Sequence, residues 1–503
     1  MPTVAALDTG VPVNHARLSP YRRGQYLDRL SAGRALGDHG SFVASRVVFG
    51  DPNSYESASA AVGRCRYYDA NVAISDEEIE DKSVVPSMTA IVATAPDVRV
   101  FNLSCDNRKP LEDLDEVERR EKLVLVQDLD NFIFGNDVLA VVAAGNTPRG
   151  VPPATPYPDH YDDPTWRLGH WARSFNALTC GSTVERLSPG GLVSEVGWPS
   201  AFARLGPGLC ESPKPDFAAH GGNCTGAYIH TAGLGVWGCT AQGLWEDRSG
   251  TSFAAPLLAQ EAALALRQLE RVCHPGARPF CVTAKAFLVL TALPPSLPGR
   301  VRPLADRALG RGYASARRLA IPLPGTAVFI WQGVIDGPKD VVRVQLPIPR
   351  DWLDQASAPR LRLVVSWDPP VNQAAHDVWA CRRLLARLRP GPDARAMYPR
   401  GPAHRSYPLL DRLYDLTRLP AGVSVRGDTW LIELSYEQIA DYYPGMDFSP
   451  QQRTAFAAEL WDDSEEPVSP QGAVQALLVS RTMTRLSVPP TVVRTPVVLR
   501  VRG

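Results

Sequence analysis

This sequence of 503 residues lacks the features that mark membrane-spanning, nucleic-acid-binding and secreted proteins. No apolar run reaches the roughly eighteen uncharged residues of a transmembrane helix, so no membrane partner is expected. Basic and acidic residues balance at 53 each, which gives no reason to expect nucleic acid or an anionic surface as a partner. The N-terminal sequence MPTVAALD lacks the basic and apolar regions of a secretory signal.

The use of cysteine argues against both disulfides and metal. The nine cysteines form an odd, scattered set without a Cys-x-x-Cys pair, which is typical of reduced thiols in a cytoplasmic protein. Cys273, His274 and Cys281 are not spaced like zinc ligands, and no aspartate cluster has EF-hand spacing. We therefore predict a cytoplasmic protein without a metal or other cofactor. Calcium held by scattered loops is left as an open alternative.

The chain's length and its hydrophobic share of 45% predict a globular protein of two domains. Residues 1–320 alternate short apolar strands with helices, the pattern of an α/β domain built on a parallel sheet. In such sheets functional residues gather at the carboxyl ends of the strands. The expected strands cover residues 4–7, 65–69, 98–104 and 138–144, and the expected helices cover 40–48, 84–95, 118–135, 253–271 and 283–292.

From residue 321 onward the pattern changes to strand-like runs separated by proline- and glycine-rich turns. This predicts a mostly antiparallel β-sandwich over residues 321–503, with strands that include 453–461 and 472–481. An insertion near 374–406 is expected to be helical and to carry a basic helix at 381–389. That basic run indicates either a solvated helix face or a surface on which a partner docks.

The most informative stretch is the heptapeptide GTSFAAP at residues 250–256, which puts Ser252 at the start of a long apolar helix. A serine hydroxyl is a weak nucleophile until a neighbouring base removes its proton. Histidine does this near neutral pH, and a buried carboxylate orients it and stabilises the imidazolium. His39, in the segment DHGSFVA, and Asp8, in the segment DTGV, supply these groups. Asp8, His39 and Ser252 are therefore predicted as a catalytic triad.

An oxyanion also needs hydrogen-bond donors, and the side-chain amide of Asn146 follows an expected strand at the same edge of the sheet. Each residue by itself has a simpler explanation. Asp8 in DTG matches the aspartic-protease signature, although a single copy lacks the second carboxylate. His39 alone would be structural, Ser252 a helix cap and Asn146 a turn residue. Together, in one α/β pattern, the four predict a catalytic arrangement.

These motifs resemble those of the subtilases, the subtilisin-like serine peptidases. The segments DTGV, DHGSFVA and GTSFAAP resemble the family's aspartate, histidine and serine motifs, and AAGN at 143–146 resembles its oxyanion motif. KPDFAA at 214–219 resembles its Lys-Pro-Asp motif, and the order Asp, His, Ser is the subtilisin order. The resemblance covers residues 4 to about 320 and implies a subtilisin-like fold. A weaker one at 360–370 links the second domain to the jelly rolls that follow many subtilases.

The resemblance also implies a protein or peptide substrate. Asn102, Leu103 and Ser104 resemble the strand that pairs with bound peptide, and Cys105 follows where a small residue is usual, so these four are the expected substrate-binding segment. Only seven residues precede Asp8, where family members carry a pro-segment. Either the protein matures without one or upstream sequence is missing.

We therefore predict a serine endopeptidase that acts through an acyl-enzyme. Two alternatives stay open. One is a protease effector that a regulatory protein partner switches on, as in bacterial defence or toxin operons, which the cytoplasmic setting favours. The other is an inactive subtilase fold that serves as a binding module.

Overall fold

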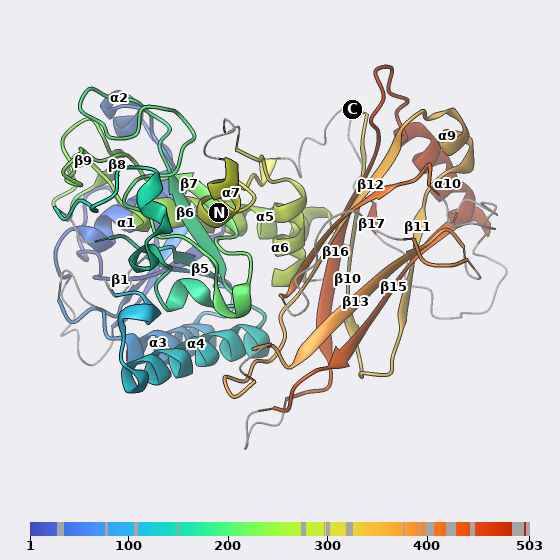
Figure 1. Ribbon diagram of the computed structural model, residues 1–503, viewed down its shortest axis with the longest axis horizontal. Coiled ribbons are helices and arrows are strands. Elements are labelled where there is room, and N and C mark those ends of the chain that lie inside the picture. Colours follow the sequence, from blue (N-terminus) through green and yellow to red (C-terminus); the bar gives the residue numbers. More distant parts are fainter. Residues whose placement is uncertain are drawn as a thin grey trace. The chain divides into compact units, whose positions relative to one another are not determined.

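The computed structural model describes residues 1–27, 35–75, 79–104, 109–147, 150–272, 278–295, 297, 302–317, 325–375, 378–391, 394–397, 407–418, 429–442, 448–484 and 497–498. Its contacts divide the chain into two compact units, whose elements are drawn in Figure 1. The first comprises Met1–Arg267 and Ala292–Ser315, and the second comprises Gln268–Thr291 and Ala316–Gly503. This division differs from the expected single boundary near residue 320, because residues 268–291 belong with the second unit.

A seven-stranded parallel sheet forms the centre of the first unit, in the order β2-β3-β1-β4-β5-β6-β7. Its strands are β1 (Thr3–Asp8), β2 (Arg22–Leu27), β3 (Arg66–Asn71), β4 (Val100–Leu103), β5 (Leu139–Ala143), β6 (Leu178–Thr183) and β7 (Phe217–His220). All residues of β1, β4, β5 and β6 are buried, as a parallel sheet covered on both faces requires. The parallel α/β sheet expected from the sequence is confirmed.

Helices cover both faces of this sheet (Figure 1). On one face, α3 (Asp81–Thr94) and α4 (Glu116–Asn136) share a hydrophobic core with Ala5 and Leu7 of β1. On the other, Phe42 of α1 (His39–Phe49) and Phe253 of α5 (Thr251–Val272) pack with Ala6. Successive side chains of a strand point to opposite faces, so β1 separates the two helix layers. The smaller elements are α2 (Tyr55–Ser59), α7 (Arg302–Ala308) and the hairpin β8 (Val236–Cys239) and β9 (Trp245–Arg248).

The second unit is rich in β-structure and contains two antiparallel sheets. One has the order β14-β12-β16-β10-β17 and the other β11-β15-β13. Side chains from both sheets share one hydrophobic core, in which Trp331 and Phe456 meet Leu388 and Trp430. The jelly-roll arrangement stays a prediction. The strands are β10 (Ala327–Ile335), β11 (Val342–Pro347), β12 (Pro359–Trp367), β13 (Arg382–Arg389), β14 (Leu409–Asp415), β15 (Thr429–Gln438), β16 (Gln452–Asp462) and β17 (Val497–Val498), and the helices are α6 (Cys281–Leu290), α9 (Arg350–Gln355) and α10 (Gln471–Thr484).

Helix α6 is tied at both ends to strands of the second unit. At its start, the Gln332 side-chain oxygen accepts hydrogen bonds from the Phe280 N–H at 2.8 Å and the Thr283 hydroxyl at 2.7 Å. At its end, the Arg362 guanidinium donates to the carbonyl oxygens of Val289 and Leu290. These bonds satisfy backbone groups that a helix end leaves without intrahelical partners.

Two expectations for the second unit are wrong. The basic run expected as a helix at 381–389 is strand β13, in which the alternating residues Arg382, Leu384 and Leu388 face inward. Its outward arginines pair across to β15, Arg383 with Glu437 and Arg389 with Glu433. A solvated helix face is therefore excluded for this run. The strand expected at 472–481 is helix α10, which follows Ser469 and Pro470 and is built of good helix formers such as alanine, glutamine and leucine.

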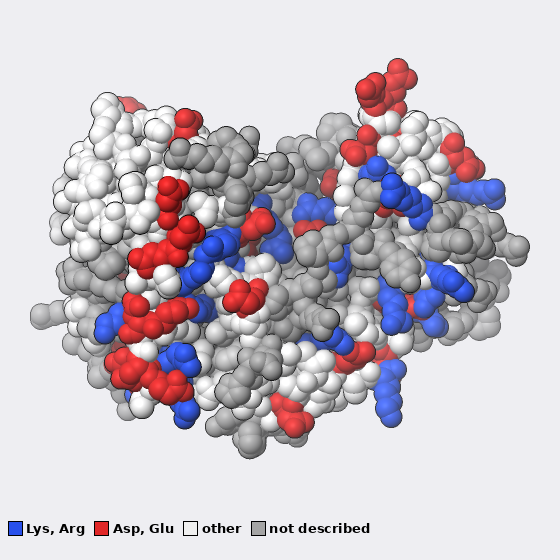
Figure 2. Space-filling view, in the orientation of Figure 1, with Lys and Arg blue, Asp and Glu red and all other residues white. Residues whose placement is uncertain are grey.

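Charges of both signs are interspersed on the face drawn in Figure 2. On α4, for example, Glu116 pairs with Arg119 at 3.0 Å and with Arg120 at 2.8 Å. Exposed pairs of this kind contribute little to stability. Among the helices that the structure describes, none is both long and apolar enough to cross a membrane.

Candidate active site

Asp8 and His39 meet at the carboxyl edge of the parallel sheet. Asp8 is the last residue of β1 and is buried, and His39 is the first residue of α1. The Nδ1 atom of His39 lies 2.7 Å from Asp8 Oδ1, a charge-assisted hydrogen-bond distance in which the imidazole N–H donates to the carboxylate. Asp8 Oδ1 also accepts the Thr9 N–H at 2.8 Å. The carboxylate can therefore fix the tautomer and the orientation of the imidazole.

The turn after Asp8 and the start of α1 approach each other closely. A Cβ atom at Gly40 would lie 2.5 Å from the carbonyl oxygen of Gly10, and Gly10 itself has a φ of +85°. The Thr9 hydroxyl accepts the Gly40 N–H at 2.8 Å and so satisfies one of the free donors at the start of the helix. This contact explains why both the aspartate and the histidine motif contain a glycine, Gly10 and Gly40.

Ser252 is the second residue of α5 and is buried beside the histidine. The Phe253 ring, next in the chain, contacts the His39 ring with centroids 5.4 Å apart. In the part of the chain that the structure describes, no hydrogen bond joins the Ser252 hydroxyl to His39. Such bonds are often long in structures without substrate. The N–H of Ser252 lies in the first helical turn, where it has no acceptor within the helix.

Asn146 follows β5 and is held from two sides. Its backbone forms an antiparallel bridge with Ala203, and the buried Arg204 side chain donates to its carbonyl oxygen at 3.1 Å. Its side-chain oxygen accepts from the Thr251 N–H at 2.9 Å and from the Thr251 hydroxyl at 3.0 Å. These bonds use the oxygen of the amide, so its NH₂ group is the part that is available to stabilise an oxyanion.

Gly250 lies near this amide and two residues before Ser252. A Cβ atom there would come no closer than 3.5 Å to the Phe253 ring and 3.7 Å to Asn146 Nδ2, which are ordinary van der Waals contacts. The protein's own packing therefore does not require glycine at this position. Space for a bound substrate is a sufficient reason for it.

The expected substrate-binding segment is only partly described. Asn102 and Leu103 lie inside β4, where β1 occupies one edge and β5 the other. A peptide can therefore add only beyond Leu103, at Ser104 and the residues after it. The Asn102 amide donates to the Ser104 hydroxyl at 2.8 Å, so Asn102 supports this segment from within the sheet. Cys105 lies outside the described residues.

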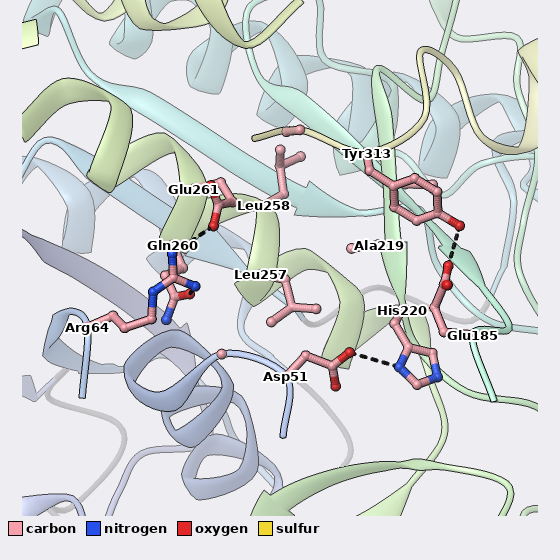
Figure 3. Close-up of a pocket in the computed structure, with 13 residues that line it drawn as sticks. Asp51, Arg64, Glu185, Ala219, His220, Leu257, Leu258, Gln260, Glu261 and Tyr313 are labelled. Carbon is pink, nitrogen blue, oxygen red and sulfur yellow. Dashed lines mark hydrogen bonds and ion pairs between the residues drawn. The ribbon is translucent and has the colours of Figure 1, made fainter. Parts of the chain in front are cut away.

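A pocket of about 360 Å³ lies beside α5, and the close-up in Figure 3 shows its lining. His220 Nδ1 lies 2.9 Å from Asp51, Glu185 pairs with Tyr313, and Arg64 pairs with Glu261. The three carboxylates Asp51, Glu185 and Glu261 thus each have a partner in the lining, whereas the buried Nε2 atom of His220 has no hydrogen-bond partner among the described residues. Burial lowers the pKa of His220, although Asp51 opposes this.

Two features of the site had no signal in the sequence. Arg46 of α1 is fully buried and donates to the carbonyl oxygen of Phe253 at 3.1 Å, which links the helices of His39 and Ser252. Asp69 is buried in β3 and accepts the Val11 N–H from the turn after Asp8 at 3.2 Å. Both depend on contacts between residues far apart in the chain, and neither lies in a motif.

By their geometry, the described residues form neither a metal site nor a disulfide. No group of three or more His, Cys, Asp or Glu side chains that could hold a metal ion occurs among the described residues. The seven cysteines in the described part of the chain are free thiols. Cys273 and His274 lie outside that part.

Comparison with known proteins gives a family match. The model of the subtilase family matches residues 1–312. The uncharacterized protein y4bN of Sinorhizobium fredii (strain NBRC 101917 / NGR234) is 25% identical over 316 residues, which are 56% of this chain and 69% of that protein.

Solved structures with similar folds are distant. The prenylagaramide maturation protease PagA is 20% identical, covers 63% of this chain and 91% of its own, and has a TM-score of 0.42. A lanthipeptide protease is 19% identical, covers 63% of this chain and 86% of its own, and has a TM-score of 0.45. At such low scores neither structure adds to the argument. The family model, however, spans more than half of the 503 residues, and this chain therefore belongs to the subtilase family.

Proposed function

We propose that this subtilase is a serine endopeptidase with Asp8, His39 and Ser252 as its catalytic triad. The observation that carries the proposal is the 2.7 Å contact between Asp8 and His39 beside the start of α5, where Ser252 lies. Membership of a peptidase family supports a peptide or protein as the substrate.

In the proposed reaction the peptide adds as a strand beyond Leu103, with Ser104 as the first pairing residue. Ser252 Oγ attacks the scissile carbonyl carbon while His39 Nε2 takes its proton, and Asp8 stabilises the imidazolium. The Asn146 amide and the Ser252 N–H donate to the oxyanion. His39 then gives the proton to the leaving amine. In the second half of the reaction water attacks the acyl carbon while His39 takes its proton, and His39 returns this proton to Ser252 Oγ as the carboxylic acid product leaves.

A fluorophosphonate probe tests the proposal, because it reacts with an activated serine and does not need the natural substrate. The folded protein is expected to be labelled at Ser252, as located by mass spectrometry of the tryptic peptide. Ser252→Ala should abolish labelling while it leaves the melting temperature within about 2 °C, because the change removes a single hydroxyl group and no packed apolar atoms. A folded wild-type protein that never reacts would contradict the enzyme proposal.

The two alternatives predict other results in the same assay. A protease that is switched on by a regulatory partner should hydrolyse casein slowly alone and faster once the partner is added. An inactive binding module should neither label nor hydrolyse casein under any condition. We also propose that the second unit is a separate β-domain. If a regulatory partner binds, its dependence on the second unit will show whether this domain is the docking site.

A further inference from the structure

A second buried carboxylate, that of Asp69, lies on the strand next to that of the proposed catalytic aspartate Asp8. Asp69 of β3 is 1% exposed. In the register of the sheet Asp8 pairs with Asn71 and Ala6 pairs with Asp69, so the two aspartates point to the same face, two residues apart along the strands. Nothing in the proposed chemistry uses Asp69.

Asp69 and Arg22 hold the turn that follows Asp8 from two directions. Asp69 Oδ2 accepts the Val11 N–H at 3.2 Å, and Arg22 Nη2 donates to the carbonyl oxygens of Val11 and Pro12 at 2.8 and 2.9 Å. The guanidinium and the carboxylate lie 3.5 Å apart and thus form an ion pair. Both polar groups of the Val11 backbone are therefore bound by this pair.

This turn determines where Asp8 points. It reverses at Gly10, whose carbonyl oxygen packs directly against Gly40 at the start of α1. A shift of the turn would consequently move the Asp8 carboxylate relative to His39, which is the first residue of that helix.

The charge on Asp69 is costly for the fold. Burial raises the pKa of Asp69 from its ordinary 3.8 to about 7, and the charge of Asp8 adds to the rise, whereas Arg22 and the Val11 N–H oppose it. An acid whose pKa is raised in the folded state contributes stability that is present below 3.8 and is lost as the pH rises through about 7. Above neutral pH, therefore, Asp69 in its ionised form makes the fold less stable than a neutral side chain would.

We propose that Asp69, together with Arg22, is a positioning residue that holds the turn after Asp8 so that this carboxylate stays aimed at His39. The inference rests on the proposed function. A carboxylate that destabilises the fold yet binds the turn next to the catalytic aspartate is what such a role requires. The charged and titratable groups that face Asp69 are Asp8 from β1, Arg22 from β2 and Tyr67 from β3, whose own pKa burial raises to about 12.

The first test is the rate of fluorophosphonate labelling of Asp69→Asn as a function of pH. Above pH 8 this variant should label about ten- to a hundredfold more slowly than the wild type, since small displacements of catalytic groups have effects of this size. Well below pH 7 the difference should shrink, because Asp69 of the wild type is then itself protonated. A ratio of rates that does not change with pH would overturn the proposal.

Gln25→Leu is the matched control. The Gln25 amide donates to the same Asp69 oxygen at 3.3 Å but does not contact the turn. Its loss should leave the labelling rate unchanged at every pH. A decrease equal to that of Asp69→Asn would show that any disturbance of the carboxylate slows labelling and would overturn the specific role of the turn.

Thermal unfolding separates positioning from stability. Asp69→Asn should melt at a higher temperature than the wild type at pH 8 and at the same temperature at pH 4. A more stable but slower variant supports the proposal. A variant that is less stable at pH 8, with labelling reduced in proportion to the unfolded fraction, would make Asp69 a structural residue only.

An NMR measurement that does not depend on catalysis tests the positioning role of Asp69 separately from the proposed peptidase activity. The His39 Nδ1 proton in the bond to Asp8 should give a downfield proton NMR signal in the wild type at pH 8. In Asp69→Asn this signal should shift or broaden. If the wild type never labels, the proposed function fails, and an unchanged signal in the variant would overturn the positioning role independently.

Discussion

Gly40 and Gly250 both lie next to or near residues of the proposed triad, but the reasons for glycine differ. At Gly40 a side chain would collide with the Gly10 backbone at 2.5 Å, so glycine is required by the fold. At Gly250 a side chain would meet only ordinary contacts, so the fold itself does not require glycine there. The sequence shows both glycines in motifs, whereas only the three-dimensional contacts separate their roles.

The orientation of the Asn146 amide leads to a prediction for Asn146→Asp. An aspartate keeps an oxygen for the Thr251 N–H and hydroxyl, so the loop should stay in place. It cannot donate to an oxyanion, however, and it puts a negative charge beside one. Loss of one such donor costs about a hundred- to a thousandfold in kcat in subtilisin, and we expect at least this decrease here. Steady-state hydrolysis of a peptide amide measures it.

The matched control is Thr251→Val, which removes the hydroxyl bond but keeps the N–H bond to Asn146. It should lower kcat by a smaller factor, because the amide loses one of its two partners. An Asn146→Asp variant as active as the wild type would exclude this residue from the oxyanion site.

At the scale of elements, Arg46 fixes the spacing between the helices that carry His39 and Ser252. It lies seven residues after His39, two turns along α1 and therefore on the same face. Its guanidinium binds the Phe253 carbonyl at the start of α5 and the His220 carbonyl at the end of β7. Asp51 pairs with it at 2.5 Å, and although burial opposes ionisation, Arg46 and His220 hold the pKa of this carboxyl well below its usual range.

We predict that Arg46→Met loosens both the fold and the site. Removal of one partner from a buried ion pair destabilises by about 3–5 kcal/mol, which chemical denaturation measures. In the fraction that remains folded, labelling by fluorophosphonate should slow by about a hundredfold, because the hydrogen bond from Arg46 to the Phe253 carbonyl is lost, while the ring contact of Phe42 with Phe253 remains. The downfield signal of the His39–Asp8 bond should persist, since that bond does not involve α5.

Arg186→Met provides the comparison for this prediction. Arg186 binds the same Asp51 carboxylate at 3.1 Å but does not reach Phe253. It should cost stability without slowing labelling of the folded fraction. Equal slowing in both variants would mean that the charge balance at Asp51, and not the helix spacing, controls the site.

The elements that the sequence predicts well are those whose local pattern agrees with their surroundings. The strand ends of Asp8 and Asn146 and the helix start at Ser252 belong to continuous apolar runs, so their positions could be inferred. Residues 381–389 could not, because Leu384, Leu385 and Leu388 suit one face of a helix as well as an alternating strand. Pairing with β15 decides between the two. Arg46 and Asp69 were missed for a related reason, since their partners are set only by the fold.

On the scale of the whole molecule, no single boundary along the chain separates the two units, because each unit is made of two separate segments. Residues 268–291, which include α6, belong by their contacts to the second unit, although the chain returns to the first unit at Ala292–Ser315. All ten residues of α6 are buried, and Gln332 and Arg362 of the second unit bind its two ends. The chain of the first unit therefore leads into and out of α6, a helix whose two ends are bound by Gln332 of β10 and Arg362 of β12.

This arrangement predicts that residues 1–315 do not form a stable protein by themselves. Each large apolar side chain of α6 that loses its cover costs about 1.5–3 kcal/mol, against a total stability of about 5–15 kcal/mol for a typical protein. The truncated chain should aggregate or melt far below the full chain in differential scanning fluorimetry, and co-expression of residues 316–503 as a separate chain should restore it. In the full chain, Gln332→Leu should destabilise by about 1–3 kcal/mol, because it leaves the Phe280 N–H and the Thr283 hydroxyl unpaired. A soluble 1–315 chain with the melting temperature of the whole protein would show instead that α6 is stable without the strands of the second unit.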